Sequence, residues 1–341
     1  MNILFDIGHP AHVHLFKNVI KFLNSENHEV KVVSRAKDVT NDLLDFEGIK
    51  YECLTKPSTS KIGMAFELAK RDLGVLRLNK KKSFDLAIGT SVSAAHLTLL
   101  KNVPSLIFNE DDDDVVPLFC NITFPFATKI IHPNEIRFTK WGEKRIKYSS
   151  YHELAYLHPN NFVPNNSVLE KYGLKSKEYI LVRKSALTAH HDSNAKGLHT
   201  ELYDMLISLA GKKRIITSDE LKKSKIKPWD MLDILNGSSF LFSDSQTMSV
   251  EAAMLGVPSI RYNSFARKCS ILTELETEYK LTFAFLPYLE LDNCIKKTTE
   301  IFNEIGLDNK IWNERKLNLL KNKVDFNKWI INYLMSEKWI H

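Results

Sequence analysis

Residues 243–262 contain side chains whose types and spacing suit the binding of a nucleotide. An apolar run at residues 239–242 predicts a buried strand, and residues 247–255 predict a helix that ends at Gly256. Backbone N–H groups in the first turn of a helix lack partners within it and lie at the positive end of its dipole. They could bind a diphosphate, whereas Ser, Asp and Thr at this position are equally typical of an ordinary helix cap.

Glu251 lies within this predicted helix, one turn or more from its start. Its carboxylate could accept hydrogen bonds from the two vicinal hydroxyls of a ribose. The alternative is a packed helix end without a ligand. The candidate nucleotide-binding residues that precede it are Ser243, Ser245, Gln246, Thr247 and Met248.

Three histidines follow the first predicted strand, residues 3–7: they are His9, His12 and His14. An imidazole titrates near neutral pH, so this segment could supply a general base. Gly8 and His9 are expected to contact the nucleotide sugar. A metal cluster or a helix-capping surface is the alternative, but three histidines on one turn cannot all reach one ion.

A run of acidic residues, 110–114, follows the predicted strand at residues 105–108. The last members of such a run usually lie in solvent. Glu110 and Asp111 directly follow the strand and are expected to point toward the same region as His12, with Glu110 as a catalytic candidate. An Asp-x-Asp pair that binds magnesium would need supporting context that is absent here, so we predict no metal site.

In the second half of the chain, the predicted strand 179–183 leads into two further histidines, His190 and His191. Arg183 at the strand end offers a planar fork to a phosphate, and either histidine could act near the transferred sugar. An interdomain salt bridge is the alternative role for Arg183. The segment 152–158 is not a zinc-protease motif, because its histidines are six residues apart rather than four.

Strands that alternate with helices predict two doubly wound α/β domains of the Rossmann type. We expect an N-terminal acceptor-side domain at residues 1–160, a linker at 161–178 and a nucleotide-sugar-binding domain at 179–309. The helical segment 310–341 could pack back on the N-terminal domain. Two such domains would face a cleft at the carboxyl ends of both sheets, where α/β sheets bind ligands.

The bulk composition is that of a globular protein. The 341 residues suit two domains, with 44% hydrophobic and 26% charged residues. The net charge of +6 is spread along the chain, so nucleic acid is not an expected partner. The four cysteines are isolated, and no leader or membrane span is evident, which predicts a cytoplasmic protein. The apolar passage 115–126 could touch a membrane or form a buried loop.

Residues 8–14, 183–191 and 243–258 together resemble the GT-B superfamily, and more closely a DUF354-type family within it. That superfamily includes MurG-like glycosyltransferases and the non-hydrolysing UDP-N-acetylglucosamine 2-epimerases. The resemblance spans most of the chain and implies a nucleotide-sugar enzyme of the GT-B fold. It does not determine the reaction.

Resemblance to MurG-like enzymes implies that His12 lies by the acceptor and that residues 245–247 and Glu251 hold the diphosphate and the ribose. The usual glycines of these loops are replaced, for example by Gln246. Resemblance to the epimerases places Glu110 at their strand-end glutamate, whereas their Gly-His-Arg-Arg-Glu-Asn strand end is matched only loosely by His190 or His191.

Taken together, these residues predict a metal-independent glycosyltransferase with no cofactor beyond its donor, a nucleoside-diphosphate sugar that is most suitably UDP-linked. The acceptor would be an envelope glycan or a lipid-linked precursor, with peripheral contact to the inner face of the membrane. A sugar-nucleotide 2-epimerase and a non-catalytic nucleotide-sugar-binding module are the alternatives.

Overall fold

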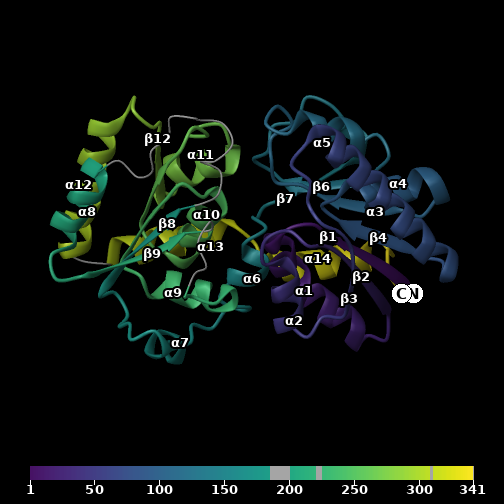
Figure 1. Ribbon diagram of the computed structural model, residues 1–341, viewed down its shortest axis with the longest axis horizontal. Coiled ribbons are helices and arrows are strands. Elements are labelled where there is room, and N and C mark those ends of the chain that lie inside the picture. The colour runs from purple at the N-terminus through teal and green to yellow at the C-terminus, as the bar shows by residue number, and fades with distance from the viewer. Residues whose placement is uncertain (185–199, 220–224, 308–309, 341) are drawn as a thin grey trace. The chain divides into compact units, whose positions relative to one another are not determined.

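The computed structural model describes residues 1–184, 200–219, 225–307 and 310–340 (Figure 1). The chain forms two compact units. Unit 1 comprises Met1–Asn161 and Lys323–His341, and unit 2 comprises Phe162–Asn322. Each unit is built on one parallel sheet with helices.

Unit 1 contains a seven-stranded sheet in the order β3-β2-β1-β4-β5-β6-β7, and every neighbouring pair is parallel. The strand order reverses between β1 and β4, which makes the carboxyl ends of these two strands the expected ligand site of the sheet. The strands are β1 (Asn2–Ile7), β2 (Glu29–Arg35), β3 (Tyr51–Thr55), β4 (Leu86–Gly89), β5 (Ser105–Phe108), β6 (Lys129–Pro133) and β7 (Arg145–Tyr148).

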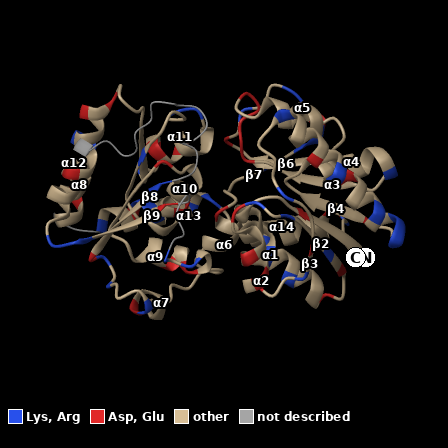
Figure 2. Ribbon diagram, in the orientation of Figure 1, with Lys and Arg blue, Asp and Glu red and all other residues tan. Residues whose placement is uncertain are grey.

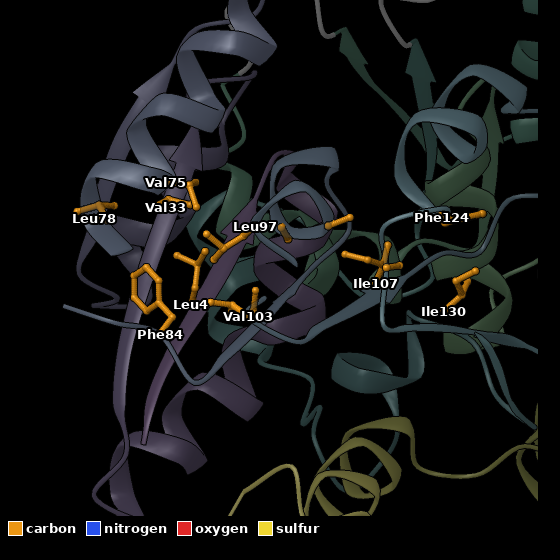
Figure 3. Close-up of a cluster of buried hydrophobic side chains, with 14 of the residues drawn as sticks. Leu4, Val33, Val75, Leu78, Phe84, Leu97, Val103, Ile107, Phe124 and Ile130 are labelled. Atoms are coloured by element: carbon orange, nitrogen blue, oxygen red, sulfur yellow. The ribbon is translucent and has the colours of Figure 1, made fainter. Parts of the chain in front are cut away.

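Helices cover this sheet because apolar side chains recur on one side of each of them. Figure 3 shows part of the resulting core, in which Val75 and Leu78 of α3 join strand residues such as Leu4 and Val33. The helices of unit 1 are α1 (Pro10–Ser25), α2 (Thr40–Phe46), α3 (Lys61–Lys81), α4 (Val92–Lys101), α5 (Pro117–Thr123), the short α6 (Leu154–Leu157) and α14 (Phe326–Ser336), with a 3-10 turn at Gly142–Lys144.

Unit 2 contains a five-stranded parallel sheet in the order β12-β11-β10-β8-β9. Its order reverses between β8 and β10. The strands are β8 (Tyr179–Lys184), β9 (Arg214–Asp219), β10 (Phe240–Ser243), β11 (Ser259–Tyr262) and β12 (Thr282–Phe285). The helices are α7 (Asn166–Lys171), α8 (Thr200–Ala210), α9 (Met231–Gly237), α10 (Gln246–Leu255), α11 (Ser270–Thr277), α12 (Leu291–Leu307) and α13 (Lys310–Asn322), with a 3-10 turn at Pro228–Asp230.

Two segments expected outside the domains have definite places in them. Residues 162–178 belong to unit 2 and include α7. The C-terminal segment is two helices, α13 in unit 2 and α14 in unit 1. They separate because the chain leaves the helix after Asn322 and Asp325 caps α14, its side chain accepting a hydrogen bond from the Lys328 N–H. Helix α14 packs against α1 and α6.

Charged residues of both signs are interspersed over both units (Figure 2). The apolar passage 115–126 is partly exposed: Leu118 is 68% exposed, whereas Cys120 and Phe124 are buried. Within the described part of the chain, no helix has both the length and the apolar character that crossing a membrane requires.

Candidate functional site

A buried ion pair supports the carboxyl end of β1. Asp6 is fully buried and binds the guanidinium of Arg71, a residue of α3 that is 5% exposed. Asp6 also accepts a hydrogen bond from the Ser91 hydroxyl at the start of α4, and Arg71 donates to the Ile7 carbonyl at 3.3 Å. Gly89 is required beside this network, because a Cβ there would lie 2.8 Å from the Asp6 carbonyl oxygen. The network fixes the two strand ends where the sheet order reverses.

Helix α1 begins at Pro10, within the histidine-rich segment 9–14. Proline suits the first turn of a helix, and the His9 side chain caps it by accepting a hydrogen bond from the Ala11 N–H at 3.2 Å. His12 therefore lies on a helix rather than in a loop. Its Nδ1 lies 3.4 Å from the Gly8 N–H and 2.6 Å from the Thr90 Oγ1 at the end of β4.

The environment of His12 keeps its imidazole neutral. Burial, followed by the nearby His9 and His152, holds the pKa of His12 well below its usual range. A neutral imidazole held by Gly8 and Thr90 can accept a proton at neutral pH. The capping of α1 by His9 and this placement of His12 are therefore compatible roles of neighbouring histidines.

His14 takes no part in this arrangement. Its ring stacks on Tyr156, with 5.0 Å between the ring centroids, and burial lowers its pKa to about 3. The three histidines of this segment do not converge. Across residues 1–184, 200–219, 225–307 and 310–340, no group of three or more His, Cys, Asp or Glu residues is arranged to hold a metal ion.

Glu110, just beyond the end of β5, binds the imidazole and the backbone of His152. The Glu110 Oε2 lies 3.0 Å from His152 Nδ1 and accepts a second hydrogen bond, from the His152 backbone N–H, at 3.0 Å. Burial opposes the ionisation of Glu110, but His152 outweighs it and the pKa of Glu110 lies below its usual value. The His152 ring stacks on Phe326 of α14 with 5.5 Å between centroids.

Asp112, Asp113 and Asp114, which follow in the acidic run, differ in burial and in hydrogen-bond partners. Asp112 is buried, and its Oδ1 accepts a hydrogen bond from the Arg137 N–H at 2.7 Å. Asp113 accepts hydrogen bonds from the backbone and the hydroxyl of Thr139, each at 2.8 Å. Asp114 is exposed, as expected for the end of the run. These carboxylates bind the next loop of unit 1 instead of converging on one point.

Asp111 is expected to make the protein less stable as the pH rises. Burial, followed by the charge of Glu110, raises the pKa of Asp111 from 3.8 to about 6. Because the folded state holds this proton more tightly than the unfolded chain, the stability gained at low pH is lost between about pH 4 and 6. Asp111→Asn should therefore raise the free energy of unfolding by about 1–2 kcal/mol at pH 7.5, and much less at pH 4.

Urea titrations at both pH values measure this difference. Asp114→Asn is the matched control, because Asp114 is an exposed neighbour whose loss should change stability equally little at pH 4 and 7.5. An Asp111→Asn effect that is the same at both pH values would contradict the assignment.

In unit 2, α10 begins directly after β10 with a capped first turn. The Ser245 side chain accepts a hydrogen bond from the Met248 N–H at 3.3 Å, and the Ser243 Oγ accepts one from the Ser245 N–H at 2.9 Å. Gln246 and Thr247 are the first two residues of α10. The helix ends as predicted at Gly256, whose φ of 72° favours glycine. The first turn of α10 is thus capped by the side chain of Ser245, as in the capping alternative.

Two further candidate residues are related to the start of α10: Arg183 through strand register, and Glu251 as a residue of the same helix. Arg183 of β8 pairs in register with Ser243 of β10, and its Nη1 donates to the Ser218 Oγ at 2.6 Å. Glu251 is 7% exposed on α10. Arg183, the next-to-last residue of β8, and Ser243, the last residue of β10, thus lie at the carboxyl ends of the two strands between which the order of the sheet reverses. His190 and His191 lie outside the described residues.

Sequence reasoning missed two partners of the candidate site, Arg71 and His152. Arg71 lies on α3 and gives no local signal in the sequence beyond an arginine on an otherwise apolar helix face. His152 drew attention only through its spacing to His158, although a histidine just beyond a strand end is itself a signal. A hollow of about 460 Å³ near Thr55, Phe66 and Lys70 contains none of the predicted site residues.

Comparisons with known proteins agree on the architecture. The family model described as "Protein of unknown function (DUF354)" matches residues 1–268. The uncharacterised protein MJ0665 of Methanocaldococcus jannaschii is 23% identical over 283 residues, which cover 76% of this chain and 81% of that protein.

Three solved structures illustrate the similarity in fold. The UDP-GlcNAc 2-epimerase of M. jannaschii, in complex with UDP-GlcNAc and UDP, has a TM-score of 0.67 at 12% identity and covers 89% of this chain and 92% of its own. S. aureus MnaA, solved with UDP, has a TM-score of 0.69 at 13% identity, covering 98% and 96%. The spinosyn forosaminyltransferase SpnP has a TM-score of 0.65 at 12% identity, covering 98% of each chain. The predicted GT-B fold of two parallel-sheet α/β domains is confirmed.

Proposed function

The chain belongs to the DUF354 family of proteins of unknown function, and we propose that it is a glycosyltransferase whose donor is a nucleoside-diphosphate sugar, most suitably UDP-linked. One observation carries the proposal. In unit 2, the sheet order reverses beside the capped start of α10, where Arg183 and Ser243 lie in register near the carboxyl ends of adjacent strands. Strand ends at such a reversal, with a helix N-terminus and a guanidinium, suit a diphosphate.

Donor binding is assigned to unit 2. The first turn of α10, residues 245–248, and Arg183 would hold the diphosphate, and Glu251 would accept hydrogen bonds from the ribose hydroxyls. His190 or His191 would act near the transferred sugar. These donors would stabilise the leaving diphosphate without a divalent ion or other cofactor. The UDP present in two solved structures of similar fold supports this choice of base.

Proton transfer is assigned to unit 1. His12 is neutral at neutral pH, so it can accept the acceptor hydroxyl proton as that oxygen bonds to the anomeric carbon. The bond from this carbon to the diphosphate oxygen breaks, and its electron pair leaves with the nucleoside diphosphate. Glu110, held ionised by His152, would stabilise positive charge that develops on the sugar or on His12. Gly8 and His9 would contact the nucleotide sugar.

Thermal-shift measurements with UDP, GDP, CDP and dTDP test donor binding, and we expect UDP to raise Tm most. Wild-type protein should also prefer UDP to 2′-deoxy-UDP, because Glu251 would bind the 2′-hydroxyl. In Glu251→Gln this preference should shrink about tenfold as the charged acceptor is lost. Glu278→Gln, at an exposed site after α11, should retain it. No shift with any of the four nucleotides would overturn the proposal.

A 2-epimerase is the second candidate, favoured by the acid–base groups at the end of β5. Glu110 and Asp111 are adjacent, and the pKa of Asp111 is raised to about 6, within the range useful for proton transfer at C2 of a sugar. Incubation with UDP-N-acetylglucosamine in deuterated water separates the two reactions. Transfer predicts no deuterium at C2, and its appearance there would establish epimerisation instead.

For the acceptor we propose an envelope glycan or lipid-linked precursor, reached by peripheral contact with the cytoplasmic face of a membrane. The support is an apolar stripe on α3, where Ile62, Phe66 and Leu73 are 67–74% exposed at helical spacing. Lysines of the same helix, Lys61 and Lys70, are also exposed (Figure 2). Apolar and basic side chains on one helix suit an anionic lipid surface.

Flotation with vesicles tests this contact. Wild-type protein should float with vesicles that contain 30% phosphatidylglycerol, and Ile62→Glu/Phe66→Glu should weaken binding roughly tenfold or more, since two apolar side chains are lost. Leu317→Glu, at a 57% exposed position of α13, is the matched control and should bind normally. Equal binding by all three proteins would rule out α3 as the contact.

A further inference from the structure

A row of polar side chains crosses the sheet of unit 2 at the carboxyl ends of its strands. Arg183 of β8 is paired in register with Ser218 of β9 on one side and with Ser243 of β10 on the other. Ser243 is paired in turn with Arg261 of β11. Side chains directly opposite each other in neighbouring strands lie on the same face of a sheet. Arg183, Ser243 and Arg261 therefore project from one face, on both sides of the reversal in strand order.

Arg261 is a buried arginine with two guanidinium nitrogens that lack hydrogen bonds within the described residues. The residue is 1% exposed, and its Nε and Nη1 are buried without a hydrogen-bond partner among the residues that the structure describes. Burial lowers the pKa of Arg261, while Cys269 and Glu276 act in the opposite direction. A guanidinium that is removed from water without hydrogen bonds destabilises the folded chain unless a further anion is supplied.

Arg261 also lies near the start of α10. Cys269 is close enough to influence its ionisation, and the Cys269 thiol donates to the Gln246 Oε1 at 3.1 Å. Gln246 is the first residue of α10. Ser243, the register partner of Arg261, accepts the Ser245 N–H at 2.9 Å. The buried guanidinium and the helix start thus belong to one small region of unit 2.

We infer that Arg261 binds the diphosphate of the nucleotide, together with Arg183 and the first turn of α10. This inference rests on the proposed donor and adds a residue to its binding site. A nucleoside diphosphate carries at least two negative charges, which two guanidiniums in one row can match. A guanidinium also presents a planar fork to phosphate oxygens. The anion would offset the cost of burying Arg261, which explains why the chain retains a buried cation there.

Arg261→Met tests the inference through calorimetric titration with UDP and with inorganic pyrophosphate. The affinity for both should fall at least about tenfold, because a charged hydrogen-bonded partner is lost. The weak binding of uridine, followed by saturation-transfer NMR, should not change. The Tm without ligand should stay equal or rise, since the variant no longer buries a charge. A purely structural arginine would instead lower Tm.

Arg214→Met is the matched control, because Arg214 begins β9 at the opposite end of the same sheet. It should retain wild-type affinity for UDP and pyrophosphate. Arg261→Lys keeps the positive charge but loses the planar guanidinium that can bind two phosphate oxygens. If Arg261→Met fails to fold, the UDP affinity of Arg261→Lys tests the inference instead. The lysine variant is expected to bind UDP several-fold more weakly than wild type.

The outcomes separate the inference from the function on which it rests. If an Arg261 variant folds and binds UDP and pyrophosphate as tightly as wild type, the inference is overturned and the donor proposal stands. If the wild-type protein binds pyrophosphate through Arg261 but none of the four nucleotides, the anion site stands and the donor proposal fails. If wild-type protein binds none of these ligands, both fail.

Discussion

Replacing Asp6 with alanine is expected to lower the free energy of unfolding of unit 1 by about 3–5 kcal/mol. Asp6 is fully buried, and its partner Arg71 has only 6% of its side chain exposed. The substitution would leave the guanidinium in the interior without its carboxylate. It would also remove the acceptor of the Ser91 hydroxyl. Urea titration followed by tryptophan fluorescence measures the loss, since Trp141 and Trp329 report on unit 1.

Two further variants identify the cause. Asp6→Ala/Arg71→Met should recover most of the lost stability, because the double variant no longer buries an unpaired charge. Glu52→Ala is the matched control: this carboxylate also binds two cations, Lys31 and Arg77, but it is 32% exposed. Its loss should cost about 1 kcal/mol or less. An Asp6→Ala cost no larger than that of Glu52→Ala would contradict a role for the buried pair.

His12→Ala should reduce turnover of the sugar nucleotide by about 10²–10⁴-fold while leaving the affinity for UDP unchanged. The loss reflects removal of the proton acceptor, whereas donor binding is assigned to unit 2. Turnover can be followed as UDP release from UDP-N-acetylglucosamine, or from whichever UDP-sugar gives the largest thermal shift. Where the acceptor is not known, turnover can be measured as the slow hydrolysis of the donor, in which water replaces the acceptor.

Thr90→Val separates positioning from chemistry. Thr90 lies 2.6 Å from His12 Nδ1, so its loss should lower turnover about tenfold through misorientation of the ring and leave UDP affinity unchanged. His96→Gln is the matched control, because His96 of α4 is bound instead to Asp72 and the Ile122 carbonyl. It should retain wild-type turnover. Full activity in His12→Ala would exclude His12 as the base.

The sequence predicts the parts of the fold that have strong local patterns. The strand 240–243 and the helix that ends at Gly256 appear where apolar runs and a terminating glycine indicate them. The first turn of α1, which Pro10 and the His9 cap begin, is not evident from the sequence because it is rich in histidine. Polar residues in the first turn of a helix obscure its amphipathic periodicity. Helix boundaries are therefore hardest to predict from the sequence at the helix starts that carry candidate site residues.

The candidate site was predictable only where its residues end strands. Ser243 and Glu110 follow apolar runs, so the sheet topology itself places them at the carboxyl edge. The residues that bind and position the strand ends lie far away in the sequence. Asp6 and its partner Arg71, for example, are 65 residues apart. Whether a helix residue such as Arg71 points inward depends on packing that one sequence does not reveal. Arg261 was missed because β11 was not recognised as a strand.

The return of the C-terminus to unit 1 imposes an order on biosynthesis. Phe326, Ile330 and Leu334 of α14 are buried in unit 1, and Phe326 stacks on the ring of His152. A ribosome makes these residues after all of unit 2, so unit 1 can complete its core only after unit 2 has been translated. Until then the nascent chain exposes an apolar face to chaperones and proteases. The partner of Glu110 thus acquires its aromatic support only after unit 2 has been made, which makes the supported Glu110–His152 pair depend on the presence of α14.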